Sequence, residues 1–213
     1  MKIAVIAGKT GIKEWLCGKA PPQWECVWVD NVDGLEQQED ADLFMDMAFT
    51  PDEGRIHQLS RLLPSPVMIN SVVHTLEEIG RPFIRINAWP GMLKRNIHEL
   101  AMMAPAQDTL QAFYKQLDLS YRIVPDVAGM VSGRILAMII NEAYYTLQEE
   151  VSTKEEIDIA MKLGTNYPFG PFEWSEYIGL ENIYDLLNKL SRSDNRYMPA
   201  AAMKDALFGL KCD

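Results

Sequence analysis

Cysteine, histidine and positive charge are scarce in this sequence. Cys17, Cys26 and Cys212 form an odd set without a CxxC spacing, so no disulfide framework or metal site is indicated and a reducing cytoplasm is expected. The 20 Lys and Arg residues are outnumbered by 30 Asp and Glu residues, which gives a formal net charge of −10. Nucleic acids and anionic membranes bind basic surfaces, so we expect neither as a partner.

Long apolar runs are also missing. No run reaches the length that crosses a bilayer, and the stretch 1–8 lacks the apolar core and cleavage site of a signal peptide. Hydrophobic residues make up 48% of the 213 residues and charged residues 23%, which is ordinary for a globular protein. The length allows one large domain or two small ones.

The first half of the chain alternates short apolar runs with polar amphipathic segments. This alternation predicts βαβ units and a parallel sheet. Pro125 then marks the boundary between a sheet domain at 1–124 and a helical domain at 125–213. We expect a polar loop at 31–40. The expected strands are 2–7, 24–29, 43–48, 66–70, 82–87 and 121–124, and the expected helices are 12–17, 51–63 and 107–117.

The second half carries helical patterns. Apolar residues in 134–147 recur at i, i+3, i+4, i+7 and i+11, which predicts a long helix nearly surrounded by protein. The Ser-Thr-Lys-Glu-Glu run at 152–156 contains a capping box and starts a second helix. The Tyr-Pro-Phe-Gly-Pro-Phe run at 167–172 cannot be regular structure, because its two prolines lack N–H donors. A third helix follows it.

Four motifs in this half occur in an order that resembles the C-terminal helical domain of the 3-hydroxyacyl-CoA dehydrogenases. They are Asp-x-x-Gly at 126–129, Asn-Glu-Ala at 141–143, Glu-Ile-Asp-x-Ala-Met at 156–161 and Gly-Pro-Phe-Glu at 170–173. Thinner similarities lie at 40–43, 69–71 and 81–84. The resemblance implies a reduced Rossmann-like sheet domain followed by an all-helical domain. It also implies an NAD-dependent oxidoreductase of fatty acid metabolism that forms a homodimer through the helical domain.

The expected cofactor turn departs from the family's pattern. A dinucleotide-binding turn needs G-x-G-x-x-G, so that the backbone can approach the pyrophosphate. The turn at 8–11 offers Gly8, Lys9, Thr10 and Gly11, and from the end of the strand the three glycine positions fall on Ala7, Lys9 and Ile12. A Lys at the second position argues against NAD, although its side chain could itself contact a phosphate. Asp30, at the end of the second strand, suits the adenosine ribose hydroxyls.

The expected catalytic positions are altered in the same way. The family uses a His as base, a Glu twelve residues later that supports it, and a Ser and an Asn that bind the reacting oxygen. The resemblance places the Glu on Glu99 and the His on Asn87, and an amide cannot act as a base near neutral pH. The family's Ser falls on Val72 and its Asn on Gly133. Asn70 and Ser71 remain as substrate-binding candidates.

Three readings follow from these residues. The first is a 3-hydroxyacyl-CoA dehydrogenase-like protein whose activity is weak, altered or absent. The second is a non-catalytic protein, a possible pseudoenzyme, that binds a dinucleotide or acyl-CoA or serves as a structural homodimer. The third, a β-hydroxyacid-type dehydrogenase, needs a catalytic Lys on the long helix, whereas Lys154 and Lys162 fall on the second helix. Among the other histidines, His74 lies near the 70–71 turn and could face a cleft, while His57 and His98 have no supporting motif.

Overall fold

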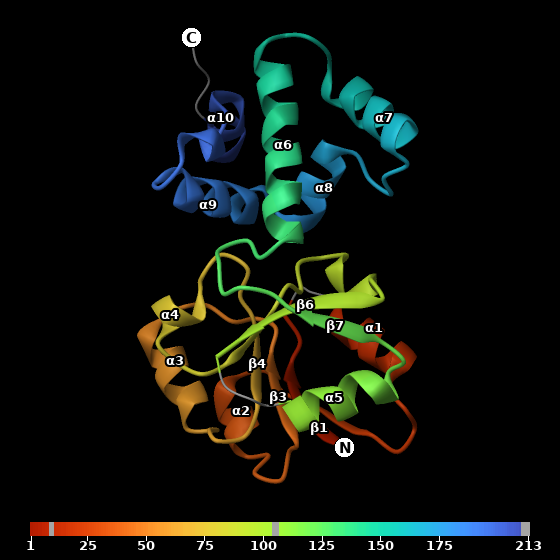
Figure 1. The fold of residues 1–213 in the computed structure, drawn as a ribbon, viewed down its shortest axis with the longest axis vertical. Coiled ribbons are helices and arrows are strands. Elements are labelled where there is room, and N and C mark those ends of the chain that lie inside the picture. Colours follow the sequence, from red (N-terminus) through yellow and green to blue (C-terminus); the bar gives the residue numbers. More distant parts are fainter. Residues whose placement is uncertain (9–10, 104–106, 210–213) are drawn as a thin grey trace. The chain divides into compact units, whose positions relative to one another are not determined.

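The computed structural model describes residues 1–8, 11–103 and 107–209 (Figure 1). The chain divides into two compact units, one spanning Met1–Met130 and the other beginning at Val131. The boundary expected at Pro125 falls a few residues earlier. The segment between the two positions bonds to the first unit, since the N–H of Gly129 donates to the carbonyl of Val72 at 2.8 Å.

The first unit is built on a seven-stranded sheet of order β2-β1-β3-β4-β5-β6-β7. All neighbouring strands pair in parallel except β5 and β6, which are antiparallel. This mostly parallel sheet confirms the predicted Rossmann-like α/β class. The elements of the unit are β1 (Lys2–Ile6), α1 (Ile12–Lys19), β2 (Glu25–Trp28), α2 (Val32–Glu36), β3 (Leu43–Asp46), α3 (Glu53–Ser60), β4 (Val67–Asn70), α4 (Leu76–Ile79), β5 (Ile84–Ile86), η1 (Met92–Lys94), β6 (Ile97–Met102), α5 (Gln107–Gln116) and β7 (Ser120–Ile123).

Two local predictions in this unit were wrong. The stretch 31–40 contains α2, whose N-cap Asn31 accepts a hydrogen bond from the N–H of Gly34, so it is not simply a loop. Glu99 lies on β6, a strand that is missing from the expected set. The sequence around Glu99 favours a helix by propensity, but pairing with β5 on one side and β7 on the other overrides that preference.

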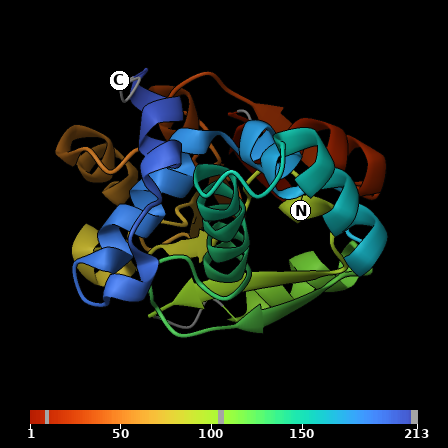
Figure 2. The ribbon, with the colours of Figure 1, turned by 90° about the horizontal axis from the view of Figure 1, so that it is seen from above.

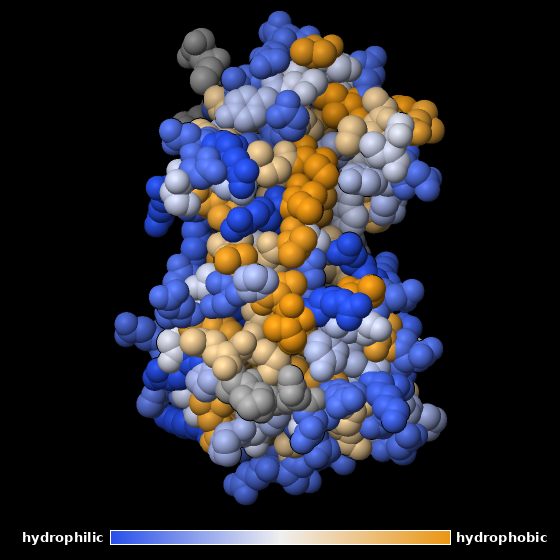
Figure 3. Space-filling model, viewed as in Figure 1, coloured by the Kyte–Doolittle hydropathy of each residue, from blue (hydrophilic) through white to orange (hydrophobic). Residues whose placement is uncertain are grey.

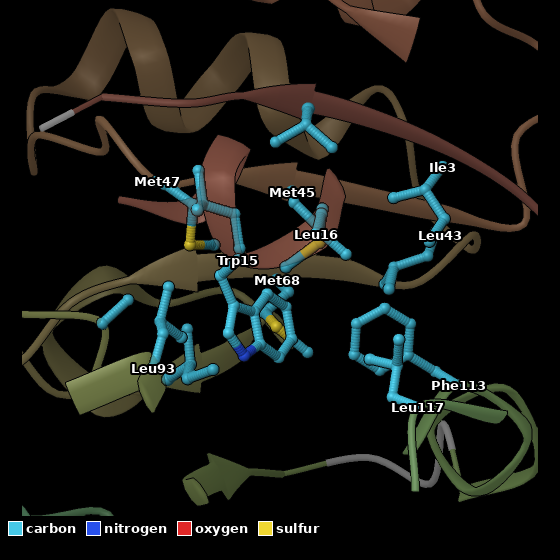
Figure 4. Packing of buried hydrophobic residues seen from close by; sticks show 14 of the residues in the cluster. Ile3, Trp15, Leu16, Leu43, Met45, Met47, Met68, Leu93, Phe113 and Leu117 are labelled. Carbon is cyan, nitrogen blue, oxygen red and sulfur yellow. The ribbon is translucent and has the colours of Figure 1, made fainter. Parts of the chain in front are cut away.

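Alternating side chains of β1 supply two separate cores. Ile3 and Val5 pack on one face with α1 and α5, whereas Ala4 and Ile6 pack on the other face with α2, α3 and α4. Figure 4 shows the first core, in which Trp15 and Leu16 of α1 lie over methionines of the sheet, with Phe113 of α5 and Leu117, the residue after α5, beside them. This two-sided burial explains why β1 is a continuous apolar run. This packing on both faces also holds in place the ends of the strands, where the candidate functional site lies.

The second unit consists of helices, as predicted. The long helix α6 stands between α7 and α8 on one side and α9 and α10 on the other (Figures 1 and 2). Its buried face includes Leu136, Ile140 and Tyr144, but Ile135 is 56% exposed, so the helix is not surrounded as expected. The elements are α6 (Ser132–Gln148), α7 (Lys154–Thr165), α8 (Pro171–Ile178), α9 (Leu180–Ser191), η2 (Asn195–Tyr197) and α10 (Ala201–Phe208).

A buried carboxylate joins α7 to α8. Asp158, 8% exposed, accepts hydrogen bonds from the N–H groups of Phe172 at 2.8 Å and Glu173 at 3.1 Å. These N–H groups belong to the first turn of α8. Backbone N–H groups in the first turn of a helix have no carbonyl partner within that helix. A Cβ on Gly170 would lie 2.3 Å from a carboxylate oxygen of Asp158, so only glycine fits there. The two motifs that resemble the family, at 156–161 and 170–173, therefore supply the two sides of one contact between α7 and α8.

Among the helices within residues 1–8, 11–103 and 107–209, none is both long and apolar enough to cross a bilayer.

Candidate functional site

The carboxyl ends of the parallel strands form the candidate site of the first unit. The chain runs from β1 outward to β2 and then returns to β3 on the opposite side of β1, so the sheet has a topological switch point between β1 and β3. Ligands of open α/β sheets bind outside the carboxyl ends of the strands at such a point. Gly8, Asp30, Asn70 and Asn87 all follow or end parallel strands of this sheet.

Asn70, Asn87 and Glu99 are brought together by strand pairing. The Oδ1 of Asn70, at the end of β4, accepts a hydrogen bond from the N–H of Ala88 at 3.0 Å. The N–H of Asn87 donates to the carbonyl of Glu99 at 3.4 Å, so Asn87 and Glu99 lie opposite each other where β5 and β6 diverge. Asn87 is 4% exposed, and its Oδ1 accepts from the N–H of Trp89 at 3.3 Å. This backbone contact orients the carboxamide of Asn87.

Ser71 and Val72 form the turn that follows β4. The hydroxyl of Ser71 donates to the carbonyl of His74 at 2.8 Å, and Ser71 is 4% exposed. Val72 is buried with 3% exposure. The hydroxyl of Ser71 therefore helps to close the turn, and Val72 contributes an apolar side chain to the interior. Gly133, where the resemblance expects an Asn, is buried in the first turn of α6.

Arg85 is a residue of this region that the sequence reasoning missed. It lies on β5, is completely buried, and pairs with Asp126. Its Nε donates to the carbonyl of Ser71 at 2.8 Å, and its Nη2 donates to the carbonyl of Val72 at 3.1 Å. Burial lowers the pKa of Arg85 from its ordinary value, and the pair with Asp126 opposes that shift. An arginine inside an apolar strand pattern was the available signal, because a buried charge needs dedicated partners.

Neither His98 nor His57 supplies a base beside Glu99. His98 is its neighbour on β6, and adjacent residues of a strand face opposite sides of the sheet. The ring of His98 is held in the core, with Nε2 3.1 Å from the carbonyl of Leu93 and Nδ1 3.2 Å from the hydroxyl of Tyr114. Desolvation lowers the pKa of His98, so the neutral ring is favoured. His57 is exposed on α3, away from these strand ends.

The nucleotide side of the site fits a dinucleotide in part. Asp30 is exposed just beyond β2, and the N-cap of α1, Gly11, makes no side-chain hydrogen bond to the first N–H groups of the helix. Such N–H groups can bind an anion, although Glu14 places a negative charge in the same turn. Gly8 has φ +59°, and a Cβ there would lie 2.8 Å from the carbonyl of Met47. A glycine is therefore required at position 8, because the backbone there passes close to the end of β3. Lys9 and Thr10 lie outside the described residues.

The helix that follows this turn packs differently from the fingerprint. Ile12, on which counting from the end of β1 places the third glycine of the fingerprint, is completely buried against the sheet. The third glycine of the fingerprint allows helix and strand to approach closely, whereas here an isoleucine side chain fills that space. The described residues therefore fit the adenosine ribose better than the pyrophosphate. No group of three potential metal ligands is found among the residues that the structure describes.

Comparisons with known proteins identify the second half most clearly. Residues 129–208 match the family model described as 3-hydroxyacyl-CoA dehydrogenase, C-terminal domain. A 3-hydroxyadipyl-CoA dehydrogenase of Escherichia coli K12 is 35% identical over 130 residues, which cover 59% of this chain and 27% of the relative. A 3-hydroxybutyryl-CoA dehydrogenase of Bradyrhizobium diazoefficiens is 30% identical over 182 residues, which cover 78% of this chain and 62% of the relative. The chain thus spans less than two thirds of the length of these curated relatives.

The fold has matches among solved structures over nearly the whole chain. The crystal structure of an (S)-3-hydroxybutyryl-CoA dehydrogenase from Ralstonia eutropha superposes with a TM-score of 0.73 at 19% identity, covering 98% of this chain and 93% of that one. At this identity the match shows the fold alone. The match of residues 129–208 places the helical domain of this chain in the 3-hydroxyacyl-CoA dehydrogenase family, and the chain as a whole is similar in sequence to members of that family.

Proposed function

We propose that this chain binds an acyl-CoA or a related thioester at the ends of β4 and β5 without catalysing efficient 3-hydroxyacyl-CoA oxidation. The observation that carries the proposal is the pairing of Asn87 with Glu99 at the point where β5 and β6 diverge. The family resemblance places a His–Glu pair at these two positions. The chain retains the acidic partner and the strand geometry but has a carboxamide where the base belongs.

The chemistry of a carboxamide explains the expected loss. Oxidation of a 3-hydroxyl group needs a residue that removes its proton near neutral pH, and imidazole can do this whereas an amide cannot. Asn87 can still hold a ligand oxygen, and Asn70 lies beside it with its Oδ1 fixed by the N–H of Ala88. Binding is therefore retained in this proposal, while proton transfer is lost.

NAD is the cofactor that the family suggests, and when bound it accepts a hydride from the substrate. In this chain Asp30 would hold the adenosine ribose, and the N–H groups of α1 would face the pyrophosphate. We propose weak NAD binding, because Ile12 replaces the glycine at the third position of the fingerprint. A reducing compartment such as the cytoplasm is proposed for the protein, with Cys17 and Cys26 both free.

The test compares the wild type with Asn87→His. NADH consumption with acetoacetyl-CoA is followed by absorbance for both proteins, and Asn87→Gln serves as a matched control that cannot act as a base. The wild type and Asn87→Gln are expected to show no turnover, whereas Asn87→His gains a measurable rate. Thermal stabilisation by acetoacetyl-CoA and by NADH is measured alongside for all three proteins.

Each outcome distinguishes between the readings. Turnover by the wild type would refute the proposal, because another residue must then act as the base. Absence of turnover in all three proteins, together with stabilisation by acetoacetyl-CoA alone, supports a binding protein that has also lost NAD. Absence of any stabilisation by acetoacetyl-CoA would refute the binding role itself.

A homodimer through the helical unit is part of the same proposal. One face of α6 lines an open groove of about 480 Å³ with Ile135, Met138 and Ile139, and Arg134 and Glu142 stand at the two ends of this stretch of helix. Figure 3 shows the hydrophobic stripe that runs along α6. Arg134 and Glu142 are equally spaced on either side of Met138. A second copy packed antiparallel about Met138 would therefore place the Arg134 of each copy near the Glu142 of the other.

Mass in solution tests this interface. Met138→Glu is expected to convert a dimer into a monomer, because it buries a carboxylate at the centre of an apolar contact. Ile159→Glu is a matched control, since Ile159 is 53% exposed on a different helix, α7, and its change is expected to leave the mass unaltered. A monomeric wild type, or a dimer unaffected by Met138→Glu, would refute this arrangement.

A further inference from the structure

Arg85 makes more hydrogen bonds than its ion pair with Asp126 requires. Besides Asp126, its guanidinium contacts the carbonyls of Ser71 at 2.8 Å, Val72 at 3.1 Å and Val127 at 3.5 Å. Arginine presents its donors in a rigid planar fork, so one side chain can hold several acceptors in fixed directions. Arg85 therefore ties two separate segments, 71–72 and 126–127, to β5.

The first of these segments carries a candidate ligand-binding residue. Ser71 and Val72 directly follow Asn70, and both of their carbonyls point at the guanidinium of Arg85. Arg85 also lies two residues before Asn87 on the same stretch of chain. It thus fixes the turn that begins at Asn70 relative to the strand that ends at Asn87, and the bond from the N–H of Ala88 to Asn70 closes the same loop of contacts.

The second anchor is Asp126, which also binds the turn. Its Oδ1 pairs with Arg85, and its Oδ2 accepts a hydrogen bond from the N–H of Glu77 at 3.2 Å. Glu77 lies in the first turn of α4, just beyond the 71–75 turn. The carboxylate therefore holds the far end of this turn while the guanidinium holds its beginning. Moving the turn would separate a completely buried charge from its partners, which is strongly unfavourable.

We propose that Arg85 is a positioning residue of the ligand site, which holds the 70–72 turn at the spacing from Asn87 that an acyl thioester requires. This rests on the proposed function, because it names a residue that shapes the same site. Arg85 does not touch the ligand. It acts through Asn70, whose carboxamide direction depends on the turn. A lysine at this position keeps the charge but cannot hold two carbonyls and a carboxylate in one plane.

The test measures two affinities, for acetoacetyl-CoA and for free coenzyme A, by isothermal titration calorimetry. Arg85→Lys is expected to weaken acetoacetyl-CoA binding about tenfold, the loss of roughly one well-placed hydrogen bond, while leaving coenzyme A binding unchanged. Arg55→Lys is the matched control, since Arg55 pairs with buried Asp46 in the same unit through bonds of 2.7 Å. It is expected to lower the melting temperature without changing the ratio of the two affinities.

The outcomes separate this inference from the proposed function. A wild type that does not bind acetoacetyl-CoA refutes the proposed function. A wild type that binds it, with an unchanged affinity ratio in Arg85→Lys, refutes the positioning role alone. If circular dichroism shows that Arg85→Lys is unfolded, Asp126→Asn decides, because it weakens the anchor of the turn and leaves Arg85 in place. A selective loss for acetoacetyl-CoA in Asp126→Asn supports the role, and an unchanged ratio refutes it.

Discussion

Asp158 is expected to hold the beginning of α8 more strongly than an ordinary helix cap. Hydrogen bonds to a charged group each contribute about 1.5–3 kcal/mol, and Asp158 accepts two from α8. Asp158→Asn keeps one acceptor but turns an NH2 group toward the other N–H and removes the charge at the helix N-terminus. We therefore expect the free energy of unfolding of the helical unit to fall by about 3 kcal/mol.

Urea unfolding followed by the fluorescence of Trp174 measures this change. Trp174 lies on α8 and is 9% exposed, and the other four tryptophans belong to the first unit, so the difference in fluorescence between the wild type and a Trp174→Phe protein reports on the helix concerned. A loss of about 3 kcal/mol corresponds to a midpoint shift of roughly 1 M urea or more. Asp52→Asn is the control, because Asp52 caps α3 by one bond at an exposed position and its change is expected to have a much smaller effect.

The steric contact with Gly170 gives a second check of the same reasoning. A Cβ on Gly170 would collide with Asp158, so Gly170→Ala is expected to be strongly destabilising in the wild type. It is expected to cost much less in an Asp158→Ala background, where the colliding atoms are absent. Equal effects of Asp158→Asn and Asp52→Asn, or additive effects of Gly170→Ala and Asp158→Ala, would refute the account of this junction.

Three further predictions concern other buried contacts. Gly8→Ala is expected to lower the free energy of unfolding by roughly 2–4 kcal/mol through its positive φ and the contact with Met47, whereas Gly11→Ala, with φ +73° and its nearest neighbour at 3.7 Å, is expected to cost about 1 kcal/mol in the same urea assay. Asn141→Leu is expected to cost roughly 1–3 kcal/mol, because it leaves the N–H of Ala200 without its side-chain acceptor and removes one of the two side-chain donors to the carbonyl of Met198, the other being Tyr145. The pKa of buried His98 is lowered in the folded state, so the unfolded state binds the proton more readily and stability is expected to fall as the pH drops below about 6.5. Measured across pH 5–8, this slope should be reduced in His98→Phe, and an unchanged slope would contradict the assignment.

The helical half was predictable because its signals are local. The apolar period at 134–147 and the capping box confirmed at Thr153 and Glu156 act within one or two turns of helix. The expectation that the whole run 167–172 is irregular was wrong, because α8 begins at Pro171, and the first position of a helix does not need the N–H that proline lacks. The exposed face of α6 was missed, because periodicity shows that residues share a face but not whether protein covers it. The role of Asp158 in capping α8 was also hidden, since it spans 14 residues of intervening chain.

The sheet half was less predictable where pairing decides the structure. β6 contains Glu, Leu, Ala and Met, which favour a helix, and it becomes a strand through its neighbours β5 and β7. The alignment of Glu99 with Asn87 could be predicted from the family resemblance, but their meeting depends on the antiparallel pairing of β5 and β6. The hydrogen-bond partners of Arg85 could not be predicted from the sequence, because they come from segments up to 42 residues away.

The order of the sheet leaves β2 and β7 as its two outer strands, each with only one partner. An outer strand presents unpaired N–H and C=O groups to which another chain can add a strand, and this is a common route to aggregation. Both strands are only four residues long, and β2 begins with Glu25 while β7 carries Arg122. Shortness and charge both oppose such edge-to-edge pairing. The short, charged outer strands therefore make it less favourable for another chain to pair with either edge of the sheet.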